Sequence, residues 1–300
     1  MNNINSETIG SVIAEIVNET PVHDLHTHLY PPTFGPLFLW GVDELVTYHY
    51  LAAELFRFWP GTPEAFFKLS TTEQADLIWE TLFVRNSPVS EAAIGVLTTL
   101  AALGLDPGSK DLREARAYFA KTNAQEHLDH VLSLAKVSGI TMTNDPLDSR
   151  ERQYWENSAF RDPRLHAVLR IDPVLNGWPG TVPALQSLGY RVTPSLDDAC
   201  LTEVRRYLEE WAERMFPQYV AVSFPDTFAY PEQSDRITLL TEAVLPVCLK
   251  LRLPFAMMIG VRKQANPRLG SAGDSVGYAD VGCVEASAQI GPPIASLSPC

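Results

Sequence analysis

Two histidines separated by one residue, His26 and His28, have the spacing in this chain that most directly indicates chemistry. They stand at the end of a short apolar run, and alternate side chains of a β-strand point to the same face. Two neutral imidazoles on one face supply half of a zinc-type site, which also needs a carboxylate or further nitrogen ligands from elsewhere in the fold. The alternative is a pair of exposed or hydrogen-bonded histidines at a strand end.

The hydrophobic pattern predicts the elements that would position these histidines. A helix is expected over 6–18 and a first strand over 21–27. Helices alone are then expected, over 43–58, 72–84, 87–103, 111–119 and 123–137. From there strands and helices alternate, with strands over 139–145, 166–172, 219–224 and 254–261 and helices over 196–215 and 234–251.

Strands that are apolar on both faces and separated by helices indicate a parallel sheet covered on both sides. The fold class is therefore α/β, either a (β/α)-barrel or an open doubly wound sheet. No Gly-x-Gly-x-x-Gly follows a strand, which weighs against a nucleotide-binding form. In a barrel the carboxyl ends of the strands carry the chemistry. The polar residues expected there are His26 and His28, Asn144 and Asp145, Arg170 and Asp172, Ser223 and Asp226, and Arg262 and Lys263.

Composition limits the partners of the chain. The 300 residues are 46% apolar and 20% charged, with a net charge of −13, so the mean field repels nucleic acid and anionic membranes. No apolar run approaches the ~20 residues of a membrane-spanning helix, and the start lacks a signal-peptide pattern. The four cysteines form no Cys-x-x-Cys, as expected of free thiols in a reducing compartment. We therefore expect a cytoplasmic protein without nucleic-acid or membrane partners.

An ordered set of motifs resembles the uronate isomerases (glucuronate isomerases) of the amidohydrolase superfamily. The His-x-His pair is followed by the tyrosine-proline loop 30–32, and the adjacent pair His49-Tyr50 stands in a later helix. The segment 143–146 resembles the family's Thr-Asp-Asp-Pro, and 170–172 resembles its Arg-x-Asp strand end. The late strand and loop 259–274 also resemble the family, so the matches extend over most of the chain.

The resemblance implies a (β/α)8 TIM barrel of the metal-dependent hydrolase type that forms a single domain over 1–300, with a helical insertion over 30–137. It also implies an isomerase that interconverts hexuronates and ketohexuronates (D-glucuronate and D-fructuronate, D-galacturonate and D-tagaturonate). The reaction takes a proton from C2 and delivers it to C1, with one divalent metal ion, zinc being the expected one. The partner is thus a small anionic sugar, and a homo-oligomer is compatible with the pattern.

Carried over position by position, the resemblance assigns a role to six residues. His26 and His28 would be metal ligands. His49 and Tyr50 would contact substrate oxygens near C1 and C2 and assist proton transfer. Arg170 would help to fix the anionic sugar and Arg262 would join it in binding. A buried arginine needs a partner, and either the substrate carboxylate or Asp172 would serve Arg170.

One departure from the family concerns its last strand, which supplies an Asp-x-Arg that nothing after Val261 matches. With about five strands expected, an eight-strand barrel is incomplete, and the tail over 286–300 has no helical or strand period. We therefore expect a truncated or frame-shifted chain of doubtful activity. The alternatives are a metal-dependent hydrolase of the same superfamily and a non-catalytic remnant. The absence of histidines after the strands at 219–224 and 254–261 weighs against a two-metal hydrolase.

Overall fold

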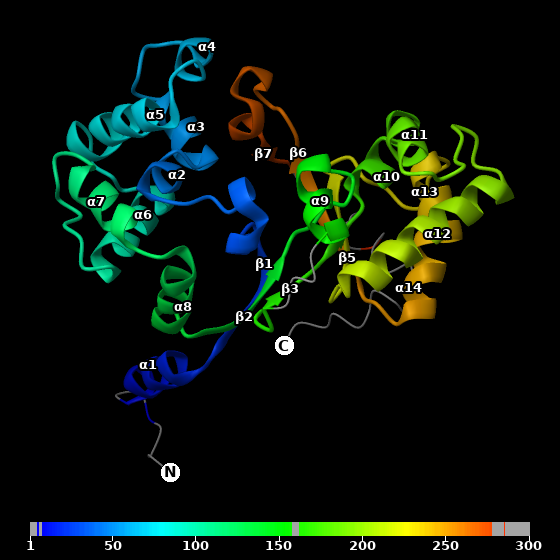
Figure 1. Ribbon diagram of the computed structural model, residues 1–300, viewed down its shortest axis with the longest axis horizontal. Helices are drawn as coiled ribbons and strands as arrows, with labels where there is room; N and C mark the ends of the chain where they lie inside the picture. The colour runs from blue at the N-terminus through cyan, green and yellow to red at the C-terminus, as the bar shows by residue number, and fades with distance from the viewer. Residues whose placement is uncertain (1–4, 6–7, 158–161, 278–284, 286–300) are drawn as a thin grey trace.

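Parallel strands alternating with helices make up the chain, as the α/β prediction requires (Figure 1). The computed structural model describes residues 5, 8–157, 162–277 and 285. The irregular tail expected over 286–300 lies outside these residues. Within the described part, no helix combines the length and the apolar composition needed to cross a membrane.

The strands form two sheets in which the spatial order follows the order along the chain. Their bounds are β1 Val22–Thr27, β2 Val137–Met142, β3 Leu165–His166, β4 Leu169–Arg170, β5 Val220–Pro225, β6 Phe255–Arg262 and β7 Ser275–Val276. One sheet has the order β1-β2-β3 and the other β4-β5-β6-β7, and all pairs are parallel except β6 with β7. A parallel bridge between Asn144 and Leu169 links the two sheets. Among the described residues the strands do not close into a barrel.

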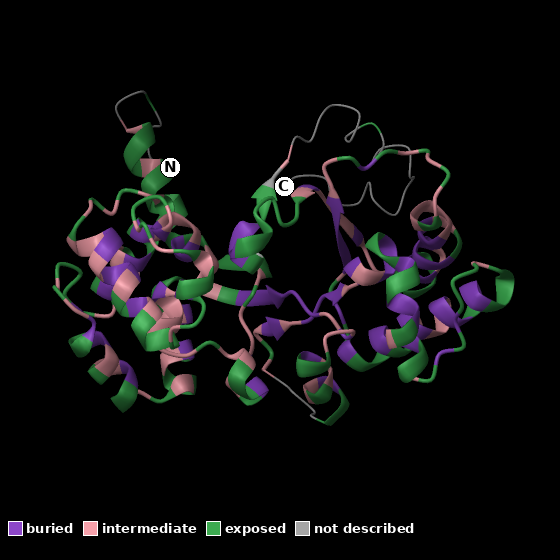
Figure 2. Ribbon diagram, turned by 90° about the horizontal axis from the view of Figure 1, so that it is seen from above, coloured by how far each residue is buried: buried purple, intermediate pink, exposed green. Residues whose placement is uncertain are grey.

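Two groups of helices lie on either side of the strands (Figures 1 and 2). The first, between β1 and β2, consists of η1 Pro32–Leu37, α2 Val42–Val46, α3 His49–Leu55, α4 Pro63–Phe66, α5 Thr71–Ile78, η2 Trp79–Val84, α6 Glu91–Ala102, α7 Arg113–Lys121 and α8 Ala124–Leu134. The second consists of α9 Ser149–Asn157, α10 Asp172–Asn176, α11 Trp178–Ser187, α12 Asp198–Met215, α13 Asp235–Leu239, η3 Leu240–Val244 and α14 Leu245–Leu251. Helix α1 Ile9–Glu19 precedes β1, and η4 Pro267–Gly273 follows β6.

Each group of helices has its own apolar core. The larger cluster packs helices α10–α14 against β2–β6, with Phe224 and Phe255 among its fully buried side chains. The smaller cluster lies within α2–α7 and also includes Leu269 and Ala272 of η4. By contrast, α1 has no buried residue, and β1 exposes Val22 and Leu25 at the edge of its sheet.

The helix predicted over 43–58 is two helices. The chain breaks between α2 and α3 at Tyr48, whose backbone is extended (φ −54°, ψ 140°). Neither a glycine nor a proline marks this break, so the sequence pattern runs through it. The break places His49 and Tyr50 in the first turn of α3.

The strand predicted over 166–172 is also different in the structure. It is split into the two-residue strands β3 and β4, and Asp172 already begins α10. Helix α11 begins with Trp178 and Pro179, and a proline is tolerated there because the first helical amides need no partner within the helix.

Candidate functional site

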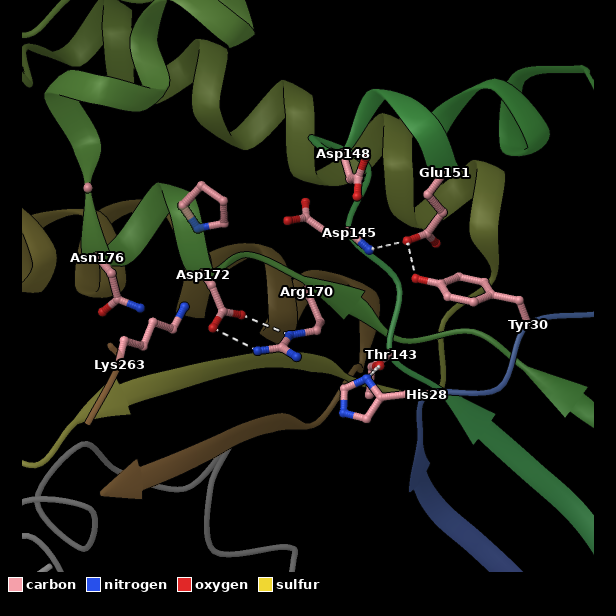
Figure 3. Close-up of a pocket in the computed structure, with 12 residues that line it drawn as sticks. His28, Tyr30, Thr143, Asp145, Asp148, Glu151, Arg170, Asp172, Asn176 and Lys263 are labelled. Carbon is pink, nitrogen blue, oxygen red and sulfur yellow. Dashed lines mark hydrogen bonds and ion pairs between the residues drawn. The ribbon is translucent and has the colours of Figure 1, made fainter. Parts of the chain in front are cut away.

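A polar cavity of about 490 Å³ lies at the carboxyl ends of the parallel strands (Figure 3). This volume falls within the range of small-molecule sites, about 300–1,000 Å³. The cavity is lined by His28, Tyr30, Thr143, Asp145, Asp148, Glu151, Arg170, Asp172, Pro173, Asn176, Gly177 and Lys263. Because β1, β2, β4 and β6 each end here, residues far apart in the sequence meet at one edge of the sheets.

His26 lies in β1 and His28 directly follows the end of that strand, and their side chains lie side by side, as their spacing predicts. Their rings meet edge to face with centroids 5.5 Å apart. Partial burial lowers the pKa of both imidazoles, and the nearby Arg170 guanidinium lowers them further. Both rings are therefore neutral at pH 7, the form in which imidazole binds a metal ion.

A short hydrogen-bond chain orients His28. Thr143 Oγ1 lies 2.9 Å from His28 Nδ1 and donates its own hydrogen to the carbonyl of Thr27 at 3.3 Å (Figure 3). A hydroxyl that has donated its only hydrogen accepts one from Nδ1–H. This tautomer leaves the Nε2 lone pair of His28 free for a ligand.

Arg170 is held by an internal ion pair. Its Nε and Nη2 donate to the two Asp172 oxygens at 2.9 and 2.8 Å, and Nη2 also donates to Ser223 Oγ at 2.9 Å. Asp172 in turn accepts the backbone N–H of Ser223 at 3.1 Å. Of the two partners that the sequence allowed for Arg170, the structure shows Asp172. The pair ties the end of β4 to β5 and fixes the guanidinium at the cavity.

A buried carboxylate organises the opposite wall of the cavity. Glu151 is 1% exposed and accepts hydrogen bonds from Tyr30 Oη at 3.0 Å, Trp155 Nε1 at 2.8 Å and the Asp145 backbone N–H at 3.0 Å. Burial raises the pKa of Glu151, and burial next to this carboxylate raises that of Tyr30. The network fixes the loop after β2 that carries Asp145.

Burial raises the pKa of Asp145 to about 6, and the nearby Asp172 carboxylate adds to the rise. The folded state therefore binds more protons than the unfolded chain between about pH 4 and pH 6, so stability falls as pH rises through this window. We expect Asp145→Asn, which keeps an acceptor for the Leu147 N–H, to match wild type at pH 4 and to exceed its unfolding free energy by about 2 kcal/mol at pH 7. Urea unfolding at both pH values measures the difference. Equal stability of the two proteins at pH 7 would contradict the raised pKa.

Of the other residues predicted for the site, His26, His49, Tyr50 and Arg262 are not among those that line this cavity. The His49 and Tyr50 rings are 4.2 Å apart, and the charge of His49 contributes to the lowered pKa of His28. Burial lowers the pKa of His49 itself, whereas Asp274 opposes that shift. Tyr50 is 62% exposed. Arg262 lines a neighbouring cavity of about 360 Å³ and not the one that His28 lines.

The two histidines fit two positions of a zinc-type coordination sphere, because both are neutral and His28 presents a free Nε2. Among the described residues, no group of three or more His, Cys, Asp or Glu is arranged to hold a metal ion. The chemistry of His26 and His28 thus supports a metal site for which these residues supply part of the ligands.

Tyr30, Glu151 and Lys263 are among the cavity residues to which no role was assigned from the sequence. Tyr30 and Glu151 meet across 121 positions of the chain, so no local pattern connects them. Lys263 directly follows Arg262, and its place at a strand end was the only sequence signal that indicated a cavity residue.

Comparison with known proteins places this chain in an enzyme class, the isomerases. The solved structure of a uronate isomerase from Bacillus halodurans C-125 matches with a TM-score of 0.92 and 49% identity, over 97% of this chain and 69% of that one. The chain belongs to the uronate isomerase family. The match to solved isomerases does not favour the hydrolase alternative.

Two more distant structures share the fold. A uronate isomerase from Thermotoga maritima has a TM-score of 0.67 and 16% identity, over 91% of this chain and 68% of that one. A glucuronate isomerase from Caulobacter crescentus has a TM-score of 0.54 and 13% identity, over 97% of this chain and 69% of that one. No protein-family model and no curated protein matches the chain.

Proposed function

We propose that the chain binds a hexuronate such as D-glucuronate in the 490 Å³ cavity and takes part in its conversion to the ketohexuronate, with one divalent metal ion, zinc by its ligand chemistry. The observation that carries the proposal is the meeting of a neutral histidine pair with a fixed arginine at the carboxyl ends of parallel strands. We propose further that β1, β2, β3 together with β4, β5 and β6 correspond to five successive strands of a (β/α)8 barrel, a topology that their spatial order supports.

The residues of this chain divide the work by their chemistry. His26 and His28 would hold the metal ion as two of its ligands, and the bound ion would supply stabilisation of negative charge on a substrate oxygen. His49, neutral because burial lowers its pKa, carries a proton between C2 and C1, and the exposed Tyr50 hydroxyl donates to a sugar oxygen. Arg170 uses Nε and Nη2 within the protein, which leaves Nη1 to donate to the sugar.

The test is proton exchange at C2 together with ketose formation. The zinc-loaded chain, incubated with D-glucuronate deuterated at C2, is expected to release the label and to form D-fructuronate, both followed by NMR. His49→Gln should slow release by about 10²-fold or more. A zinc-loaded chain that releases no label and forms no ketose would refute the proposal. If the chain keeps no stoichiometric zinc after dialysis, that result would favour the alternative that it is a non-catalytic remnant.

The hydrogen-bond chain to His28 gives a separate prediction for metal affinity. Thr143→Val removes the acceptor for Nδ1–H, and we expect zinc to bind about 10–100-fold more weakly. Thr143→Ser keeps the hydroxyl and should retain the affinity. Competition with a chromophoric chelator measures both dissociation constants. Equal affinity of the valine and serine variants would show that the hydroxyl does not act on the metal site.

A further inference from the structure

The charges that line the 490 Å³ cavity are mostly already paired within the protein. Of its four carboxylates, Asp172 pairs with Arg170, and Asp148 pairs with Arg150 at 2.6 Å. Glu151 accepts hydrogen bonds from Tyr30 and Trp155. The charge of Arg170 is thus neutralised by Asp172, and the guanidinium alone gives an entering anion little net attraction.

Lys263 is the exception among the cations. It follows β6, is exposed, and its side chain extends to the same cavity (Figure 3). In the part of the chain that the structure describes, its ammonium has neither a hydrogen bond nor an ion pair. Asp172 is nearby but is engaged by Arg170, so the ammonium is available to a ligand.

His28 and Lys263 reach the cavity from β1 and β6, the first and last of the parallel strands. The two ends of a hexuronate also differ. Its reacting carbons C1 and C2 stand at one end and its carboxylate stands at the other. Lys263 also lines the neighbouring 360 Å³ cavity, so it lies where the two cavities adjoin.

From this arrangement we infer that Lys263 is a specificity-determining residue that binds the substrate carboxylate and orients C1 and C2 toward His26 and His28. The inference rests on the proposed function and names the group that distinguishes an acidic sugar from a neutral one. An ammonium–carboxylate hydrogen bond is charge-assisted and is stronger than a hydrogen bond to a hydroxyl. A neutral sugar of the same shape gains no such bond at Lys263.

The test compares an acidic and a neutral sugar on the same protein. Dissociation constants for D-glucuronate and D-glucose are measured by ligand-detected NMR on the zinc-loaded chain, for wild type, Lys263→Met, Lys263→Arg and the control Lys68→Met. Lys68 is an exposed lysine of the helical region that lines neither cavity.

We expect Lys263→Met to bind D-glucuronate about tenfold more weakly and D-glucose unchanged. Lys263→Arg and Lys68→Met should bind both sugars as wild type does. The inference is overturned, with the proposed function intact, if wild type binds D-glucuronate and Lys263→Met binds it equally well, or if both sugars weaken together. If wild type itself binds no D-glucuronate, both the inference and the proposed function fail.

Discussion

Replacing Asp172 with alanine is expected to lower the free energy of unfolding by about 3–5 kcal/mol, because it leaves the Arg170 guanidinium buried without a counter-charge. The two side chains are only 18% and 10% exposed, and they share two hydrogen bonds. The substitution also removes the acceptor of the Ser223 backbone N–H, so β4 and β5 lose a connection at their carboxyl ends. Urea unfolding followed by tryptophan fluorescence measures the loss.

Two variants separate the buried charge from the pair itself. Arg170→Met combined with Asp172→Leu removes both charges, and we expect it to recover a large part of the loss. Lys250→Ala disrupts an exposed pair with Glu209, in which the lysine is 63% exposed, and should change stability by less than about 1 kcal/mol. If Asp172→Ala costs no more than Lys250→Ala, the guanidinium does not depend on this carboxylate in the folded protein.

Glu151→Ala is the second substitution with a large expected effect, also about 3–5 kcal/mol. It strands three donors in a buried region, namely Tyr30 Oη, Trp155 Nε1 and the Asp145 backbone N–H. The same unfolding experiment measures it. Glu156→Ala is the matched control on the same helix, because its carboxylate is 42% exposed and lies 3.9 Å from Arg152. We expect that control to stay within about 1 kcal/mol of wild type.

The Glu151 network also predicts a spectroscopic change. The carboxylate and burial together raise the pKa of Tyr30. In Glu151→Gln, which is uncharged and similar in size, the tyrosine absorbance titration should include a group that ionises at lower pH than in wild type. An unchanged titration curve would mean that the carboxylate does not act on Tyr30.

The sequence predicted the parts of the fold that depend on local periodicity. The side chains of His26 and His28 lie side by side because a strand alternates its side chains, and the parallel pairing was predicted from apolar strands separated by helices. The break at Tyr48 could not be predicted, because no helix-breaking residue marks it. Asp172 could be named from the sequence as a possible partner of Arg170, because a buried arginine needs a counter-charge.

The rest of the site depends on contacts between distant segments. Glu151 meets Tyr30 across 121 positions, and Thr143 meets His28 across 115. No spacing rule reports such contacts, because they arise only when β1 and β2 pair. Arg262 and Lys263 were both expected at a strand end, but only Arg262 was given a role in substrate binding. The two residues are neighbours on one strand end, and only the folded sheet determines which of them lines the cavity beside His28.

The agreement between strand order in space and along the chain has a consequence for synthesis on the ribosome. Strands β5 and β6 each emerge when the strand they pair with is already made, so the second sheet can grow at one edge. Strand β1 is different, because its partner β2 appears only after the whole helical region has been translated. During that interval Val22 and Leu25 lack a neighbouring strand, while the cluster of α2–α7 can already bury its own side chains. The translation time of the helical region therefore sets how long the backbone of β1 stays unpaired in the nascent chain.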